Sequence, residues 1–363
     1  MKRPTKLSEA RTLAKTNPDP ALLHWEKGKA GAAAACVRTL SLLTPSAAVL
    51  KALASYGGDK RGGVVKELIL ASVGFDAVVF AQQVLAKNPA KKVDLSPLKA
   101  PDLRLIAGMS ALEVLKLDTW GLDTQMAALG ALPKLHTLTV DLVKVDALTG
   151  LEALGSLRTL TLNRCHNLTD FTALSALSVL ETVNVNAPQK LTSVAGLSLP
   201  PSVTSLSIDV ASVLNSLAGL DALPALSSLR LGSNWKLRDY RPLASLKTLD
   251  SLFIHSFDCT DITALTGLTG LTGLWLSSPL LEDFAPLSTL TQLKSLSLNG
   301  CKRLRSLAPL HTMTALEDLR IQLCPQLTDL DVLEHLPSLS TVSNYTNKDH
   351  PVFSRRPDIT VTP

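Results

Sequence analysis

The chain has 363 residues, of which 46% are apolar and only 4% aromatic, and its formal net charge is +5. That length and apolar content can bury an extended core built mainly from leucine and alanine. No apolar run approaches the roughly 18 residues that a membrane-spanning helix needs, and residues 1–15 lack the apolar segment of a signal peptide. We therefore expect a protein of the cytoplasm with no membrane contact.

The charge is unevenly distributed along the chain. Residues 1–100 hold 16 basic and 7 acidic side chains, whereas the remainder holds 20 and 24. An anionic polymer bound by Lys2, Arg3, Lys91 and Lys92 is one interpretation of the basic end. A solvated lysine surface is the other, and the absence of a nucleic-acid motif favours it. We expect no nucleic-acid partner.

Residues 1–36 precede a repeated pattern. They predict two short helices, over residues 7–15 and 21–27, separated by Asn17-Pro18-Asp19-Pro20. An array of repeats exposes the leucines of its terminal units unless something covers them. We therefore predict that residues 1–36 form an N-terminal helical cap.

From residue 37 onward one arrangement of apolar residues recurs. The frame L-x-x-L-x-L occurs at Leu293, Leu296 and Leu298, and strict copies follow one another at intervals of 22 or 23 residues. The other strict copies begin at Leu112, Leu135, Leu157, Leu180, Val203, Leu226, Leu249, Leu271, Leu316 and Leu339. Looser copies begin at Val37, Val65 and Ala90, which gives about 14 coils. Units this small bury their apolar faces only against neighbours, so the pattern predicts a solenoid.

The repeat resembles the leucine-rich-repeat family. Residues 157–168 read L-R-T-L-T-L-N-R-C-H-N-L, which fits L-x-x-L-x-L-x-x-(N or C)-x-x-L. Segments such as residues 283–287, DFAPL, resemble the short repeats of internalin-type proteins, here without a signal peptide or surface anchor. The resemblance covers residues 37–343 and implies an α/β fold. It implies a curved right-handed coil with a parallel sheet on its concave face.

The convex side should change along the chain. Residues 47–56 and 76–87 are long enough for helices between the first strands. From residue 112 onward each coil has room only for a 3₁₀ or extended segment there. Residues 344–363 break the repeat with three prolines, and we predict a C-terminal cap with a last strand near residues 358–361.

The ninth position of each coil is the expected internal slot for Asn or Cys. Cys165, Asn234, Cys301 and Cys324 occupy it, and the cysteines there are predicted to be reduced and buried. By the same count the slot holds a different residue in six coils: Trp120, Val143, Pro188, Ala211, Phe257 and Pro279. Cys36 and Cys259 are not assigned by the pattern.

Side chains alternate along a strand, so the fourth and sixth positions face the core and the third, fifth and seventh face solvent. The fifth position gathers bulky residues. Arg230, Phe253 and Trp275 fall on consecutive strands, Arg320 lies two strands beyond Trp275, and His255 borders Phe253. Exposed aromatics with arginine are typical of binding hot spots, so these five residues are the candidate protein-binding site. Alternatively, the C-terminal tail covers them, or they only pair across strands.

The seventh position carries a polar ladder on five successive strands. Its members are Asp118, Asp141, Asn163, Asn186 and Asp209. Stacked carboxylates repel, so a basic partner, a cation or a neighbouring arginine should compensate them. A linear column does not converge on one point as calcium ligands do, and such residues also end strands in ordinary turns. We expect no metal site.

No catalytic motif pairs a nucleophile with a base, so we expect no enzyme activity and no cofactor. The predicted function is binding of a cytoplasmic protein through the concave face, and the family resemblance implies a regulatory or inhibitory role. One alternative is a sensor whose Phe253 and Trp275 stack on a sugar or nucleotide. The others are the anionic-polymer binder and a purely structural unit. The sequence does not define the oligomeric state.

Overall fold

The structure is a computed structural model of the chain. It describes residues 91–94, 109–118, 129–130, 132–142, 144–234, 236–344 and 350–362. The chain forms two compact units, Met1–Leu160 and Thr161–Pro363. The predicted N-terminal cap, the helices expected over residues 47–56 and 76–87, Cys36, Lys2, Arg3 and Trp120 all lie outside the described residues.

Short parallel strands occur where the frame predicts them. The first unit contains β1 (Lys92–Asp94), β2 (Val114–Asp118) and β3 (Thr137–Asp141), and β4 (Thr159–Asn163) lies at the boundary between the units. The second unit contains β5 (Thr182–Asn186), β6 (Ser205–Asp209), β7 (Ser228–Gly232), β8 (Ser251–His255), β9 (Gly273–Ser277), β10 (Ser295–Asn299), β11 (Asp318–Gln322), β12 (Thr341–Asn344) and β13 (Thr360–Thr362). Within each unit, strands that follow one another in sequence pair in parallel.

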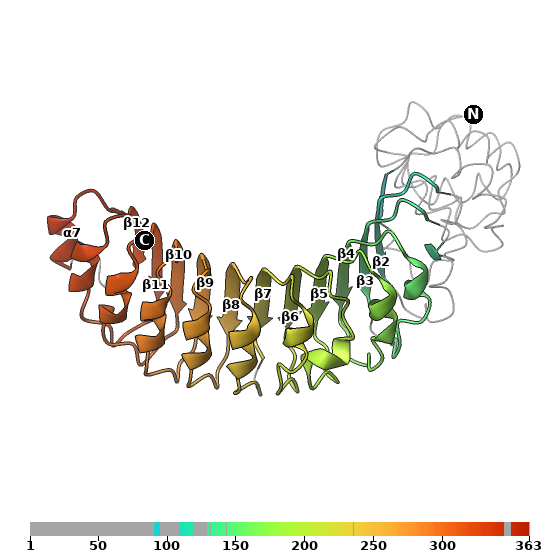
Figure 1. Cartoon of the computed structure of the whole chain (residues 1–363), viewed down its shortest axis with the longest axis horizontal. Helices are drawn as coiled ribbons and strands as arrows, with labels where there is room; N and C mark the ends of the chain where they lie inside the picture. The colour runs from blue at the N-terminus through green and yellow to red at the C-terminus, as the bar shows by residue number, and fades with distance from the viewer. Residues whose placement is uncertain are drawn as a thin grey trace, which may run out of the picture. The chain divides into compact units, whose positions relative to one another are not determined.

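One turn of 3₁₀ helix returns each coil to the next strand. These helices are η5 (Leu151–Ala153), η6 (Thr172–Ala176), η7 (Val194–Leu197), η8 (Leu220–Ala222), η9 (Arg241–Ser245), η10 (Thr263–Gly267), η11 (Ala285–Thr289), η12 (Ala308–Thr312) and η13 (Asp331–His335). Several begin after an aspartate that accepts a hydrogen bond from a backbone N–H two residues on, as Asp261 does from Thr263 at 2.8 Å. In the second unit the strands line the concave side and the 3₁₀ helices the opposite side, as predicted (Figure 1).

The core follows the predicted alternation. On β4, Leu160 and Leu162 are fully buried while Thr159, Thr161 and Asn163 are partly exposed. The same alternation recurs from β5 to β11, where the fourth and sixth residues of each coil are buried leucine, isoleucine or valine. Apolar residues that precede and follow the 3₁₀ helices, most of them leucines, complete the core. Within the second unit, successive coils therefore share an apolar interior.

The turn after each strand depends on the length of the coil. In coils of 23 residues, called long coils here, the eighth residue has a positive φ and the ninth side chain is buried. The left-handed residues are Arg164, Ala187, Val210, Ser233, Gly300 and Leu323. Coils of 22 residues, called short coils, begin at Leu135, Leu249 and Leu271. They lack the left-handed step, and their eighth residues, Leu142, Ser256 and Ser278, are buried instead.

This difference corrects the predicted slot in two short coils. Phe257 and Pro279 do not occupy it, because a turn with one residue fewer reaches the core one position earlier. Phe257 is 45% exposed and Pro279 is half-buried. Pro188 and Ala211, in long coils, are buried as predicted. Val143 lies outside the described residues.

The slot residues form different hydrogen bonds. Asn234 accepts one from the Ala211 N–H at 3.1 Å and donates one to the Ile208 carbonyl at 3.2 Å. The Ser278 hydroxyl donates to the Cys259 carbonyl at 2.6 Å. In contrast, the Ser256 hydroxyl is buried without a hydrogen-bond partner in the described structure.

All four cysteines within the described residues are free thiols in the core. Cys165, Cys301 and Cys324 are buried as predicted, and Cys259, which the pattern left unassigned, is buried too. Burial raises the pKa of the Cys259 thiol to about 12, so this side chain is neutral at ordinary pH.

The C-terminal segment closes the sheet. It contains the short helix α7 (Val352–Arg355) and β13, the last strand expected near residues 358–361. The Arg356 guanidinium donates to the carbonyls of Leu333, Leu336 and Leu339 at 2.7, 3.2 and 3.3 Å. Asp358 binds the same guanidinium at 2.7 Å. Arg356 therefore binds backbone acceptors of the last complete turn and ties the C-terminal segment to it.

Candidate functional site

Three of the predicted contact residues form one stack on the concave face. Arg230 on β7 lies opposite Phe253 on β8, which lies opposite Trp275 on β9. The rings of Phe253 and Trp275 are parallel within 3°, with centroids 3.8 Å apart. The Arg230 Cζ lies 3.6 Å from the centroid of the Phe253 ring. We call these three residues the aromatic stack.

Asp209 holds the arginine of the stack in place, and Gly232 leaves room for its carboxylate. Both carboxylate oxygens of Asp209 accept hydrogen bonds from the Arg230 Nε at 3.1 Å, and Asp209 also accepts one from the Ser207 hydroxyl at 2.7 Å. Gly232 makes room for this carboxylate, because a Cβ on residue 232 would lie 1.7 Å from the Asp209 Oδ1. The sequence predicted neither role. The guanidinium is therefore held over Phe253 by a carboxylate that lies against the backbone of Gly232.

His255 and Phe257 extend the stack towards the loops that follow the strands. His255 meets the Trp275 ring edge-on at 5.9 Å and lies 5.4 Å from the Phe257 ring. Burial, then the nearby charge of Arg230, lowers the pKa of His255 from its usual 6.5, with Asp209 acting in the opposite direction. Phe257 was missed by the sequence prediction, which placed it inside the coil. The length of its coil was the signal that could have placed it outside.

Arg320 stands apart from the stack. Ser297 on β10 separates it from Trp275 in the register of the sheet. Its Nε lies 3.3 Å from the Asp318 carboxylate, and 60% of its side chain is exposed. The structure thus brings together Arg230, Phe253, His255 and Trp275, but leaves Arg320 one open position away.

The polar ladder is divided between the two units. In the first, Asp118 pairs in register with Asp141, and in the second Asn186 pairs with Asp209. Asn163 lies on β4. Arg230 compensates the charge of Asp209, as expected of a neighbouring arginine. No group of three potential metal ligands occurs among the described residues.

A serine and a histidine, residue types that also form catalytic pairs, lie in contact beside the aromatic stack. The Ser233 hydroxyl lies 3.3 Å from the His255 Nδ1, a pairing the sequence did not predict. Among the described residues no carboxylate hydrogen-bonds to His255. The positive φ of Ser233 recurs at the same position of every described long coil, so it is a property of the repeat and not strain specific to a nucleophile.

The basic end is only partly described. Lys91 is 67% exposed along its side chain and forms an ion pair with Glu113 at 2.8 Å. Lys92 lies on β1 and is exposed. The anionic-polymer alternative therefore stays untested, because Lys2 and Arg3 lie outside the described residues.

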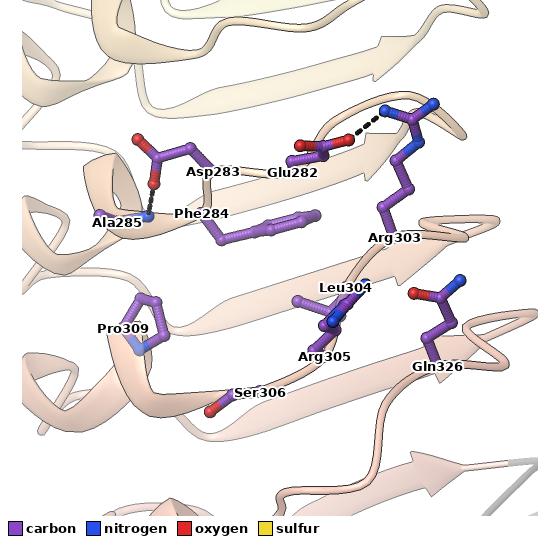
Figure 2. A pocket seen from close by; sticks show the side chains of 10 residues that line it. All are labelled: Glu282, Asp283, Phe284, Ala285, Arg303, Leu304, Arg305, Ser306, Pro309 and Gln326. Atoms are coloured by element: carbon purple, nitrogen blue, oxygen red, sulfur yellow. Dashed lines mark hydrogen bonds and ion pairs between the residues drawn. The ribbon is translucent and has the colours of Figure 1, made fainter.

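A pocket of about 560 Å³ lies away from the aromatic stack, between the loops that follow β9, β10 and β11 (Figure 2). Phe284 and Leu304 contribute apolar walls, and Arg303 forms an ion pair with Glu282 across its upper edge (Figure 2). The other lining residues are Asp283, Ala285, Arg305, Ser306, Pro309 and Gln326. None of the predicted contact residues lines this pocket, so it does not support a ligand sensor built on Phe253 and Trp275.

Comparison with solved structures agrees with this architecture. An internalin from Listeria monocytogenes is 20% identical, with 78% of this chain and 92% of that chain covered and a TM-score of 0.55. The chain has the leucine-rich-repeat fold. A leucine-rich-repeat protein from Leptospira interrogans matches at 15% identity, 76% and 97% coverage and a TM-score of 0.41. TLR13 in its complex with ssRNA13 matches at 19% identity, 76% and 54% coverage and a TM-score of 0.45.

Of these three structures, the internalin alone has a TM-score high enough to support an argument, and at 20% identity that argument concerns the fold alone. Searches with protein-family models and among curated proteins gave no match. Within the described leucine-rich repeats, no helix is long and apolar enough to cross a membrane. The expected absence of a nucleic-acid partner is untested and stays a prediction.

Proposed function

We propose that this leucine-rich-repeat chain is a non-enzymatic module that binds a cytoplasmic protein through its concave face and thereby regulates or inhibits it. The observation that carries the proposal is the aromatic stack. Phe253 and Trp275 occupy solvent-facing positions of a sheet, where they have no core to fill. Aromatic residues beside arginine in such positions are the usual centre of a protein interface.

The stack is ordered before any partner binds. Asp209 fixes Arg230, Arg230 covers one face of Phe253, and Trp275 covers the other. Immobilising a flexible side chain on binding costs about 0.5–1.5 kcal/mol, and a preformed stack avoids most of that cost. Small residues flank the stack, among them Ser228, Ser251 and Gly273, so the backbone of a partner can approach the sheet closely.

The described part of the C-terminal tail does not cover the stack. β13 pairs with β12, at the end of the sheet, whereas Trp275 lies on β9. Cross-strand pairing alone remains the competing interpretation, since it would give the same geometry without a partner. The two interpretations differ in what removal of the rings does to binding.

The test compares the proteins that immobilised wild type and two double variants retain from a cell lysate at physiological salt. Phe253→Ala, Trp275→Ala should lose a specific protein that wild type retains, with affinity reduced at least roughly 30-fold, the effect of one strong hot spot. The matched control, Thr161→Ala, Asn184→Ala, removes a cross-strand hydrogen bond from the same column and should retain it. Circular dichroism verifies the fold. Equal retention by all three variants would contradict the proposal.

A further inference from the structure

The column that contains the aromatic stack continues with a small residue and then a second arginine. Ser297 on β10 lies opposite Trp275, and Arg320 on β11 lies opposite Ser297. Along five consecutive strands the column therefore reads Arg230, Phe253, Trp275, Ser297, Arg320. Four of these positions carry a ring or a guanidinium, and the fifth carries the short side chain of Ser297.

Among the described residues, one face of the Trp275 indole is covered by another ring. Phe253 stacks on that face, and His255 meets the indole edge-on. The opposite face is turned towards Ser297, whose side chain ends at a hydroxyl. Ser297 itself is only 8% exposed, as expected of a short side chain between taller neighbours. We call the space above this serine the Ser297 gap.

The gap has the width of one planar ring. Parallel strands lie about 4.8 Å apart, so the positions of Trp275 and Arg320 are separated by about 9.6 Å. The existing layers are 3.8 Å apart between the two rings and 3.6 Å apart between guanidinium and ring. One further ring could therefore contact the indole on one side and the guanidinium on the other.

We propose that the Ser297 gap receives one aromatic side chain of the protein partner, held between Trp275 and Arg320. This inference rests on the proposed function and names the chemistry that the concave face recognises. The inserted ring would complete the sequence guanidinium, ring, ring, ring, guanidinium.

The charge of Arg320 selects the occupant. The negative face of an aromatic ring attracts a guanidinium, whereas a lysine or arginine of the partner would be repelled. The pair between Arg320 and Asp318 is exposed and has a distance of 3.3 Å, so it contributes little and leaves the guanidinium able to turn onto a ring.

The test uses N-acetyl-L-tyrosinamide as the probe and the indole N–H signal of Trp275 as the reporter, assigned with Trp275→Phe. A saturable shift of that signal is expected for wild type, and none for N-acetyl-L-leucinamide. Ser297→Phe fills the gap from within the chain and should abolish the shift. Thr161→Phe, at the same column position on β4, should leave it unchanged. Arg320→Gln should weaken the probe roughly two- to fivefold.

Three outcomes would overturn the inference: no saturable shift, equal binding of leucinamide, or tighter binding of adenosine than of the tyrosine probe. If the Ser297→Phe protein does not fold, Ser297→Leu replaces it in the test, because leucine fills the gap without a ring. The lysate experiment separates the two proposals. A Ser297→Phe protein that retains the partner lost by Phe253→Ala, Trp275→Ala contradicts the gap while the proposed function stands. Retention by both contradicts the proposed function.

Discussion

The short coils beginning at Leu249 and Leu271 and the long coils around them place different residues at the surface. A long coil leaves its strand through a left-handed residue and then buries its ninth side chain. The two short coils omit that step, bury a serine and expose Phe257 beside His255. They also carry Phe253 and Trp275. Coil length, as well as residue type, therefore decides which side chains reach the surface.

The largest expected effect is on a long coil. Asn234→Ala removes two buried hydrogen bonds and leaves the Ala211 N–H without the side-chain acceptor that it has in the folded protein. Because buried unpaired backbone groups are costly, we expect a loss of about 3 kcal/mol in the free energy of unfolding, measured by urea denaturation. A loss below about 1 kcal/mol would show that water replaces the amide in the slot.

A smaller loss of stability is expected for a substitution at Gly232, the residue that makes room for the Asp209 carboxylate. Gly232→Ala would bring a Cβ within 1.7 Å of the Asp209 carboxylate and force it away from Arg230. We expect a destabilisation of about 1–2 kcal/mol and a changed indole signal of Trp275. Gly270→Ala is the matched control, because a Cβ there meets nothing within 4 Å. An unchanged indole signal in Gly232→Ala would show that the stack keeps its geometry without the contact between Asp209 and Arg230.

Replacing the buried slot residue of a short coil by alanine should not lower the free energy of unfolding, in contrast to Asn234→Ala. The Ser256 hydroxyl lies near the Tyr240 hydroxyl, yet neither oxygen makes a hydrogen bond in the described structure. Ser256→Ala removes one unpaired buried group, so we expect unchanged stability or a gain of up to about 1 kcal/mol. A clear destabilisation in the same urea assay would mean that the two hydroxyls bond to each other in solution.

The smallest effect is a pH dependence at the edge of the stack. The pKa of His255 is lowered in the folded protein, so the unfolded chain binds the proton more readily. The stability contribution is complete above pH 6.5 and is lost as the pH falls from there towards the folded pKa. We expect wild type to lose stability relative to His255→Gln between pH 7 and pH 5. An NMR titration giving a His255 pKa above 6.5 would contradict this.

Sequence periodicity was sufficient for the strands, the inward leucines and the last strand of the cap, because each follows from a local pattern of apolar residues. It also placed Arg230, Phe253 and Trp275 on consecutive strands. It failed at Phe257 and Pro279, because a fixed offset from the first leucine ignores the length of the turn. The binding role of these residues stays a prediction.

The geometry of the stack could not be predicted for another reason. The position of Arg230 depends on Asp209, one strand away in a different column, and on the missing Cβ of Gly232. The pocket beside Phe284 likewise combines loops of three coils and has no signal in any one of them. Such features depend on rotamers and neighbours, whereas periodicity reports only which face a residue occupies.

Arg356 also affects how the solenoid comes apart. A chain of stacked coils unravels from its ends, since a terminal coil has a neighbour on one side only. At the C-terminal end, the Arg356 guanidinium donates hydrogen bonds to the carbonyls of Leu333, Leu336 and Leu339 and pairs with Asp358. The last coil must release these bonds together, so fraying there is a single concerted step. This arginine thereby protects strands that lie several coils further in, including those that carry Phe253 and Trp275.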